Sequence, residues 1–145
     1  MPAIESELIT AGDDYRARCE AMQKSLDEFR AAEEQVAATE RGAKEKFVKR
    51  GKLLPRERID RLLDSGAPFV ELMSLAGRKM HDDRDGSTAG GGVIAGIGYV
   101  GGIRCLVTAS NSAIKGGTIA PAGLHKSLRL LEIAKQNKLP IVALT

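Results

Sequence analysis

Apolar side chains recur every three or four residues in the first third of the chain, which is the spacing of an α-helix. Between Asp14 and Arg41 there is no proline or glycine, and the apolar positions form one narrow stripe. The stripe consists of Tyr15, Cys19, Met22, Leu26, Phe29 and Val36. Glu33 interrupts it, which argues against a long coiled coil. The pattern predicts a helix that lies along another subunit or the main body, or else an ordinary surface helix.

The pattern then changes to short apolar runs separated by proline and glycine. Pro55 can begin a short helix, and Ser65-Gly66 can end it. The inward-facing residues of this helix are predicted to be Ile59, Leu62 and Leu63. The run PFVELMSLAG, residues 68–77, predicts a strand.

A glycine-rich segment, GIGYVG at residues 96–101, matches the GxGxxG pattern of dinucleotide-binding folds. That motif requires a helix directly after it, whereas Gly101-Gly102 is followed by the β-rich run IRCLVTAS. Two apolar runs on either side of Gly-Gly predict a β-hairpin instead. Gly96 and Gly98 lie on one face of the first strand, where they leave room for a group packed above them.

The last third predicts a strand from Ile103 to about Ala109, a turn, and a helix from Pro121 to about Asn137. The predicted buried stripe of this helix is Leu124, Leu128, Leu131 and Ala134, and the predicted polar positions are Lys126, Arg129, Lys135 and Lys138. After Pro140 the run IVALT predicts a short apolar strand. Apolar strands around a crossover helix are typical of a parallel, covered sheet.

Composition narrows the possible functions. The 145 residues suit one modest domain or part of a larger one. The net charge of +3 is compatible with anionic ligands, but it is far from a nucleic-acid footprint. Aromatic residues make up only 3% of the chain, which argues against binding single strands by base stacking. Cys19 and Cys105 are isolated, so neither a zinc site nor a disulfide framework is indicated.

The start of the chain, MPAIESELIT, has neither a basic beginning nor a long apolar stretch, so it does not resemble a secretory signal. No window approaches the roughly 20 apolar residues that a membrane span needs. We therefore expect a soluble, cytoplasmic protein without membrane partners.

Two segments carry candidate chemistry. Seven basic residues fall within residues 44–58: Lys44, Lys46, Lys49, Arg50, Lys52, Arg56 and Arg58. This run is either a solvated face or a positive rim that binds phosphates through charge-assisted hydrogen bonds. His81, Asp82, Asp83 and Asp85 raise the question of a metal site, but the run is crowded and glycine-rich, so we expect a solvated loop and no metal.

Three blocks of the sequence resemble, in order and spacing, the start of the carboxyltransferase (β) subunit of biotin-dependent acyl-CoA carboxylases. They are GKLLPRERIDRLLDSGAPFVEL, GGGVIAGIGYVGGIRCLVTASNSAIKGGT and HKSLRLLEIAKQNKLPIVALT, and together they cover roughly residues 40–145. The IKGGT turn and the HKSLRLLEIA helix look closer to the methylcrotonyl-CoA and geranyl-CoA branch than to the propionyl-CoA branch.

The resemblance implies an α/β, crotonase-type spiral of ββα units, partial here and preceded by an N-terminal helix. It implies transfer of a carboxyl group from carboxybiotin, carried by a partner protein, to an acyl-CoA. The implied partners are further carboxyltransferase subunits and a biotin carboxylase or biotin carrier subunit. Oxyanion holes of backbone N–H groups supply the catalysis in this family, so no side-chain nucleophile is required.

Relatives continue from the strand corresponding to LPIVALT into a glycine-rich turn that donates to an oxyanion. We therefore expect no catalytic residue in this chain, because those glycines lie beyond Thr145, and we expect an incomplete subunit that is inactive alone. The expected division is an N-terminal helical segment, residues 1–49, and the first part of the carboxyltransferase N-terminal domain, residues 50–145.

With the resemblance, the turn of Lys115, Gly116 and Gly117 is expected to line the acyl-CoA site, and Arg56 and Arg58 to meet the CoA phosphates. The alternative for the turn is a tight strand-to-helix connection with a solvated lysine. Alternatives for the chain are another crotonase-type CoA enzyme, a biotin-dependent decarboxylase subunit, or a non-catalytic fragment whose N-terminal helix docks partner subunits.

Overall fold

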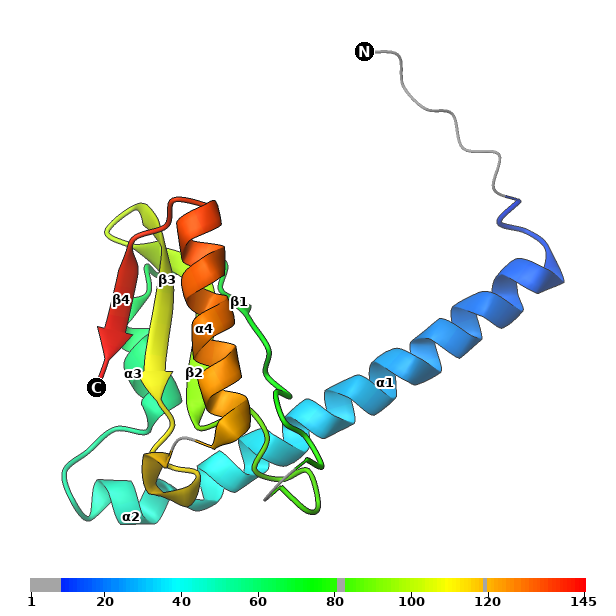
Figure 1. The fold of residues 1–145 in the computed structure, drawn as a ribbon. Helices are drawn as coiled ribbons and strands as arrows, with labels where there is room; N and C mark the ends of the chain where they lie inside the picture. The colour runs from blue at the N-terminus through cyan, green and yellow to red at the C-terminus, as the bar shows by residue number, and fades with distance from the viewer. Residues whose placement is uncertain (1–8, 81–82, 119) are drawn as a thin grey trace. The chain divides into compact units, whose positions relative to one another are not determined.

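The computed structural model describes residues 9–80, 83–118 and 120–145. They divide between Ala31 and Ala32 into two compact units, called here the first and the second unit. The helices are α1 (Asp13–Gly42), α2 (Lys44–Val48), α3 (Pro55–Leu62) and α4 (Pro121–Gln136), with a 3-10 turn η1 (Lys115–Gly117). The strands are β1 (Val70–Glu71), β2 (Val93–Val100), β3 (Ile103–Ser110) and β4 (Ile141–Leu144). Figure 1 labels the four helices and the four strands. The predicted division between residues 49 and 50 stays a prediction.

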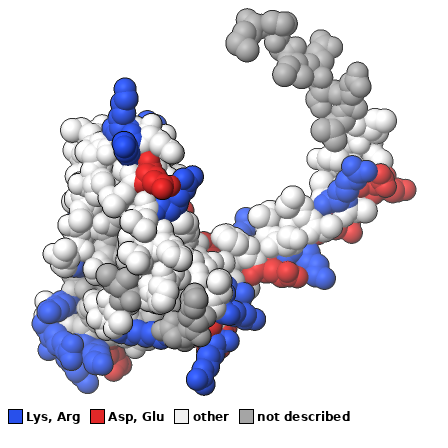
Figure 2. Space-filling view, viewed as in Figure 1, with Lys and Arg blue, Asp and Glu red and all other residues white. Residues whose placement is uncertain are grey.

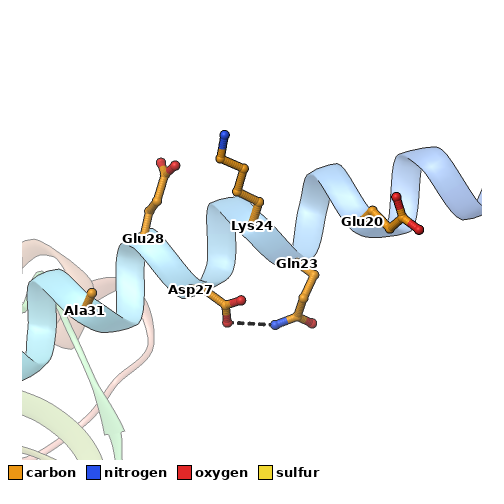
Figure 3. A pocket seen from close by; sticks show the side chains of 6 residues that line it. All are labelled: Glu20, Gln23, Lys24, Asp27, Glu28 and Ala31. Carbon is orange, nitrogen blue, oxygen red and sulfur yellow. Dashed lines mark hydrogen bonds between the residues drawn. The ribbon is translucent and has the colours of Figure 1, made fainter.

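Helix α1 confirms the first predicted helix, and its apolar stripe has two environments. In the second unit Val36 is buried and packs with Ala89 and Ile114. In the first unit Met22, Leu26 and Phe29 are exposed. An open hollow on this part of the helix is lined by Glu20, Gln23, Lys24, Asp27, Glu28 and Ala31 (Figure 3). Within it, Gln23 Nε2 donates to Asp27 Oδ1 at 2.8 Å.

The sheet has the strand order β1-β2-β3-β4. Strands β2 and β3 are antiparallel and pair Val93 with Ser110 at one end and Val100 with Ile103 at the other, which confirms the hairpin and the rejection of the dinucleotide motif. Among the described strands β3 and β4 are the one parallel pair, so the expectation of a parallel sheet is right for this pair alone. The predicted strand over residues 68–77 shortens to β1.

Alternate residues of a strand point to opposite faces, so each face of the sheet has its own core. On one face Ile59 of α3 packs with Ile94, Cys105, Val107 and Ala109. On the other face Leu130 and Ala134 of α4 pack with Ala95, Leu106 and Leu139. Helices α3 and α4 therefore cover opposite faces of the sheet (Figure 1).

The glycines of β2 lie under packed side chains, as predicted. A Cβ atom on Gly96 would lie 2.4 Å from Cζ of Phe69. A Cβ atom on Gly98 would lie 2.6 Å from Cδ2 of Leu63. The missing side chains let α3 and the segment after it approach the strand closely.

The predicted buried face of α4 is wrong for three of its four residues. Leu124, Leu128 and Leu131 are each more than half exposed, at 54%, 52% and 54%. The residues that the helix does bury are Gly123, Lys126, Leu130 and Ala134. Both sets have helical spacing, and tertiary contacts select between them. Lys126, which was predicted to lie on the polar side of the helix, is buried.

One acidic residue is buried in the described part of the loop after β1. Asp83 is only 5% exposed, and its carboxylate accepts hydrogen bonds from the backbone of Lys79 and from Thr88. Burial raises the pKa of Asp83, but these hydrogen bonds outweigh it and hold the pKa below its ordinary value. The prediction of a solvated loop is wrong for Asp83.

His81 and Asp82 lie outside the described residues, and among those described no group of three or more His, Cys, Asp or Glu could hold a metal ion. The described helices include none with the length and apolar character of a membrane span.

Candidate anion-binding site

The turn after β3 has the backbone conformation that its glycines predict. Lys115, Gly116 and Gly117 have φ values of 46°, 67° and 82°, in the left-handed region that favours glycine. The N–H of Ile114 donates to the carbonyl of Asn111 at 3.1 Å, and the N–H of Gly117 donates to the carbonyl of Ile114 at 3.0 Å. These bonds fold the turn back on itself before α4 begins.

The main chain of the turn is open on one side. A Cβ atom built on Gly116 would meet no described atom within 4 Å. A Cβ atom on Gly117 would lie 3.4 Å from Cα of Ser112, which is ordinary contact. Gly117 is thus required for its dihedral angles, whereas Gly116 also leaves space for another molecule to approach the backbone.

The turn faces the basic segment across a cavity of about 380 Å³. The cavity is lined by Ala43, Lys46, Phe47, Arg50, Lys52, Ser112, Ala113, Lys115 and Gly116. The structure therefore brings two separate predictions, the basic run and the glycine turn, to one place. We call this cavity the basic pocket.

A second cavity, of about 500 Å³, adjoins the basic pocket and shares Phe47, Lys52 and Ser112 with it. It adds Arg58, whose Nη2 donates to the carbonyl oxygen of Thr145 at 3.1 Å. Figure 2 shows lysine and arginine side chains gathered at the lower left, over α2. Together the cavities present five basic side chains to a ligand: Lys46, Arg50, Lys52, Arg58 and Lys115.

Phe47 gives this basic surface an apolar component. Its ring is half-buried and lines both cavities. Cations around an aromatic ring suit a ligand that carries phosphates next to an apolar or aromatic group. Sequence reasoning missed Phe47; the available signal was its position as the single aromatic residue within the basic run.

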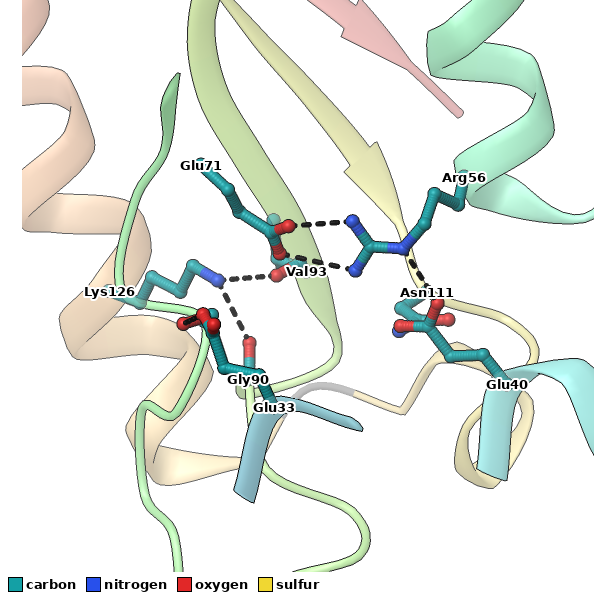
Figure 4. Close-up of polar contacts among 9 residues, drawn as sticks. Glu33, Glu40, Arg56, Glu71, Gly90, Val93, Asn111 and Lys126 are labelled. Carbon is teal, nitrogen blue, oxygen red and sulfur yellow. Dashed lines mark hydrogen bonds and ion pairs between the residues drawn. The ribbon is translucent and has the colours of Figure 1, made fainter. Parts of the chain in front are cut away.

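Arg56 has a different environment from the other basic residues. Its Nε atom donates to Oε2 of Glu40 at 3.1 Å, and its Nη1 and Nη2 atoms donate to Glu71 at 2.6 and 3.2 Å (Figure 4). Burial opposes the positive charge, but the bonds to Glu71 and Glu40 raise the pKa of Arg56 above its ordinary value. Arg56 is not among the described lining residues of the two cavities, and its contact with substrate stays a prediction.

Lys126 completes this buried network. It is 2% exposed, and its Nζ atom donates to the carbonyls of Val93 at 2.6 Å and Gly90 at 3.2 Å. Burial lowers the pKa of Lys126 to about 8, and the negative charges of Glu71 and Glu40 limit that shift. The charges of Glu71, Arg56 and Glu40 therefore act on Lys126 through space, while its hydrogen bonds go to backbone carbonyls. The sequence did not predict this network, because a lysine in an amphipathic helix is typical of the polar face.

Comparison with known proteins identifies the family to which this architecture corresponds. The family model described as "Carboxyl transferase domain" matches residues 46–145. The beta subunit of geranyl-CoA carboxylase from P. aeruginosa, known from a crystal structure, is 58% identical with a TM-score of 0.89. That match covers 99% of this chain and 27% of the other.

Two curated relatives belong to the methylcrotonyl-CoA branch. The biotin-dependent 3-methylcrotonyl-coenzyme A carboxylase beta1 subunit of Mycobacterium tuberculosis is 49% identical over 102 residues, covering 70% of this chain and 19% of that protein. The probable mitochondrial methylcrotonoyl-CoA carboxylase beta chain of Drosophila melanogaster is 37% identical over 142 residues, covering 97% of this chain and 24% of that protein. These matches confirm the resemblance seen in the sequence. The chain spans about a fifth to a quarter of the length of the curated relatives.

Proposed function

Because the chain belongs to the carboxyl transferase domain family, we propose that it forms the N-terminal part of the carboxyltransferase (β) subunit of a biotin-dependent acyl-CoA carboxylase. The observation that carries the proposal is the similarity to the geranyl-CoA carboxylase beta subunit across 99% of the chain. The subunit transfers a carboxyl group from carboxybiotin, carried by a partner subunit, to an acyl-CoA. The ββα units belong to a crotonase-type spiral, in which backbone N–H groups form the oxyanion holes.

In this function the basic pocket and the cavity beside it hold the phosphates of the acyl-CoA. Five cationic side chains line the two cavities, and the open backbone at Gly116 admits a ligand close to the main chain. The ring of Phe47 offers an apolar surface for the non-phosphate parts of CoA. Lys115, Gly116, Gly117 and Arg58 are the proposed substrate-binding residues. The proposed cytoplasmic location rests on the sequence alone, since the Drosophila relative is named as mitochondrial.

Replacing Lys115 with alanine tests the proposed site. If Lys115 makes a charge-assisted contact with a CoA phosphate, the variant loses about 1–3 kcal/mol of binding free energy. The measurement is the dissociation constant for CoA by calorimetry, repeated at rising salt, because screening weakens phosphate contacts and should reduce the difference between wild type and variant.

The matched control is Lys135→Ala, which removes an exposed lysine of α4 that lines neither cavity. Gly117→Val is expected to weaken binding further, because a β-branched residue resists a positive φ. If CoA binds Lys115→Ala and Lys135→Ala equally well, the turn is a structural connection and the site assignment is wrong.

We further propose that the exposed stripe of α1 docks another subunit of the assembly. Met22, Leu26 and Phe29 recur at helical spacing and are 62%, 39% and 48% exposed. Helices gain most of their stability from burying such a face. Docking also agrees with the homo-oligomer that the family implies.

Replacing Met22 and Phe29 together with glutamate is expected to lower the mass of the oligomer, because charges on the docked face would be desolvated. Light scattering on the assembled protein gives the mass. The control places two glutamates at Ala17 and Ala31, which are exposed positions off the stripe. Equal masses for the two double variants would show that the stripe makes no subunit contact.

A further inference from the structure

The carboxylate of Glu40 joins the buried network to the turn that lines the basic pocket. Glu40 lies near the end of α1, in the second unit, and is 5% exposed. Its Oε2 atom accepts the hydrogen bond from Arg56, and its Oε1 atom accepts one from Nδ2 of Asn111 at 2.6 Å (Figure 4). Asn111 is the first residue after β3. One side chain therefore connects α3 to the start of the turn.

Asn111 is held through its backbone as well as its side chain. Its N–H donates to the carbonyl of Gly92 at 2.8 Å, and its own carbonyl accepts from Ile114. Ile114 is 3% exposed and packs with Val36 and Ala89, while its carbonyl accepts from Gly117. A continuous series of hydrogen bonds thus runs from Glu40 through Asn111 and Ile114 to Gly117.

The Asn111 side chain makes one directional bond and leaves its other polar atom unpaired. The residue is 4% exposed, and its Oδ1 atom is buried without a hydrogen-bond partner among the described residues. A buried polar atom without a partner costs about 1–3 kcal/mol. An apolar residue would avoid that cost at Oδ1, but it would leave Oε1 of Glu40 without the bond from Asn111. What an apolar residue cannot supply is the directional bond from Nδ2 to Glu40.

We propose that Glu40 and Asn111 form a positioning pair that orients the turn of residues 112–117 for binding the phosphates of acyl-CoA. Through this pair Ser112, Lys115 and Gly116 face the basic residues of α2 and the segment after it across the pocket. Neither member of the pair lines the described cavities, so each acts through the turn. The inference rests on the proposed CoA site.

Two substitutions of Glu40 separate positioning from general stability. Glu40→Ala and Glu40→Gln both remove the charge that pairs with Arg56. Only Glu40→Gln can keep a hydrogen bond to Asn111, because the two side-chain amides can pair after one of them rotates. We expect the dissociation constant for CoA to rise about tenfold in Glu40→Ala and less than about twofold in Glu40→Gln, as loss of one oriented hydrogen bond predicts.

Asn111→Ala provides a second test that keeps Glu40 in place. We expect about a tenfold rise in the CoA dissociation constant, and little further rise when Lys115→Ala is added, because residues that act as one unit have non-additive effects. Glu71→Gln is the matched control: it removes a negative charge that faces the guanidinium of Arg56, and among the described residues Glu71 bonds to Arg56 and not to the turn. It should lower the thermal midpoint and leave CoA binding unchanged.

Each outcome supports or contradicts the proposed positioning role of Glu40 and Asn111. If Lys115→Ala weakens CoA binding while Glu40→Ala and Asn111→Ala do not, the positioning role is wrong, but the proposed CoA site still holds. If Glu71→Gln weakens binding as much as Asn111→Ala, the effect is one of general stability and the positioning role is again wrong. If CoA does not bind the wild type, or if Lys115→Ala has no effect, both the site and the pair are overturned.

Discussion

We expect the Arg56→Leu variant to lose about 3 kcal/mol in its free energy of unfolding, because the change leaves two carboxylates without their cation. Glu40 is 5% exposed and would keep only its bond to Asn111, while Glu71 would lose both of its bonds to the guanidinium. The value lies at the lower end of the range for a broken buried ion pair, because the Arg56 side chain is 37% exposed. Urea unfolding followed by circular dichroism gives the measurement.

The control for this variant is Arg129→Leu on α4. Arg129 pairs with Glu132 at 2.8 Å, but both side chains are more than half exposed. Exposed pairs contribute about 0–1 kcal/mol, so this variant should unfold close to the wild-type midpoint. Similar losses in the two variants would mean that the Arg56 network is solvated in solution and does not act as a buried unit.

Gly91→Ala is expected to be the other strongly destabilising change. A Cβ atom at this position would lie 2.6 Å from Cα and 2.7 Å from N of Gly123, which are backbone atoms of α4 that cannot rotate away. Gly91 also has a φ of 66°, which costs a residue with a side chain about 1–2 kcal/mol. Overpacking adds about 1–3 kcal/mol, so the total loss is about 2–5 kcal/mol.

Gly101→Ala isolates the steric part of this effect. Gly101 has a similar φ of 59°, but a Cβ atom there meets no described atom within 4 Å. This variant should lose only the conformational part, about 1–2 kcal/mol. Urea midpoints that fall equally in both variants would contradict close packing of the loop before β2 against α4.

The sequence predicts most of the elements in this fold, because their signals are local. The hairpin follows from Gly101-Gly102 between two β-rich runs, and both glycines have the positive φ that such a turn needs. Helices α3 and α4 begin at Pro55 and Pro121, as a proline at the first helical position predicts. The shortness of β1 was not predictable, since a strand extends only as far as its partner pairs with it.

The candidate site was predicted in its parts but not as a whole. Residue type alone indicated that Lys115 and the basic run of residues 44–58 suit anions. The packing of α2 determines which basic residues face the turn. Lys46, Arg50 and Lys52 line the basic pocket, whereas Arg56 bonds to Glu71. The difference has a physical cause: Glu40 and Glu71 come from distant parts of the chain and meet at the Arg56 guanidinium.

The family, the helix of α1, the hairpin and the position of the turn after β3 could all be predicted without the structure, because each depends on the order of neighbouring residue types. The buried face of α4, by contrast, depends on packing against the rest of the second unit. Two stripes on that helix have the same period, and local pattern cannot choose between them. The choice follows from long-range contacts: Gly123 admits the backbone of Gly91, and the carbonyls of Gly90 and Val93 accept the buried ammonium of Lys126.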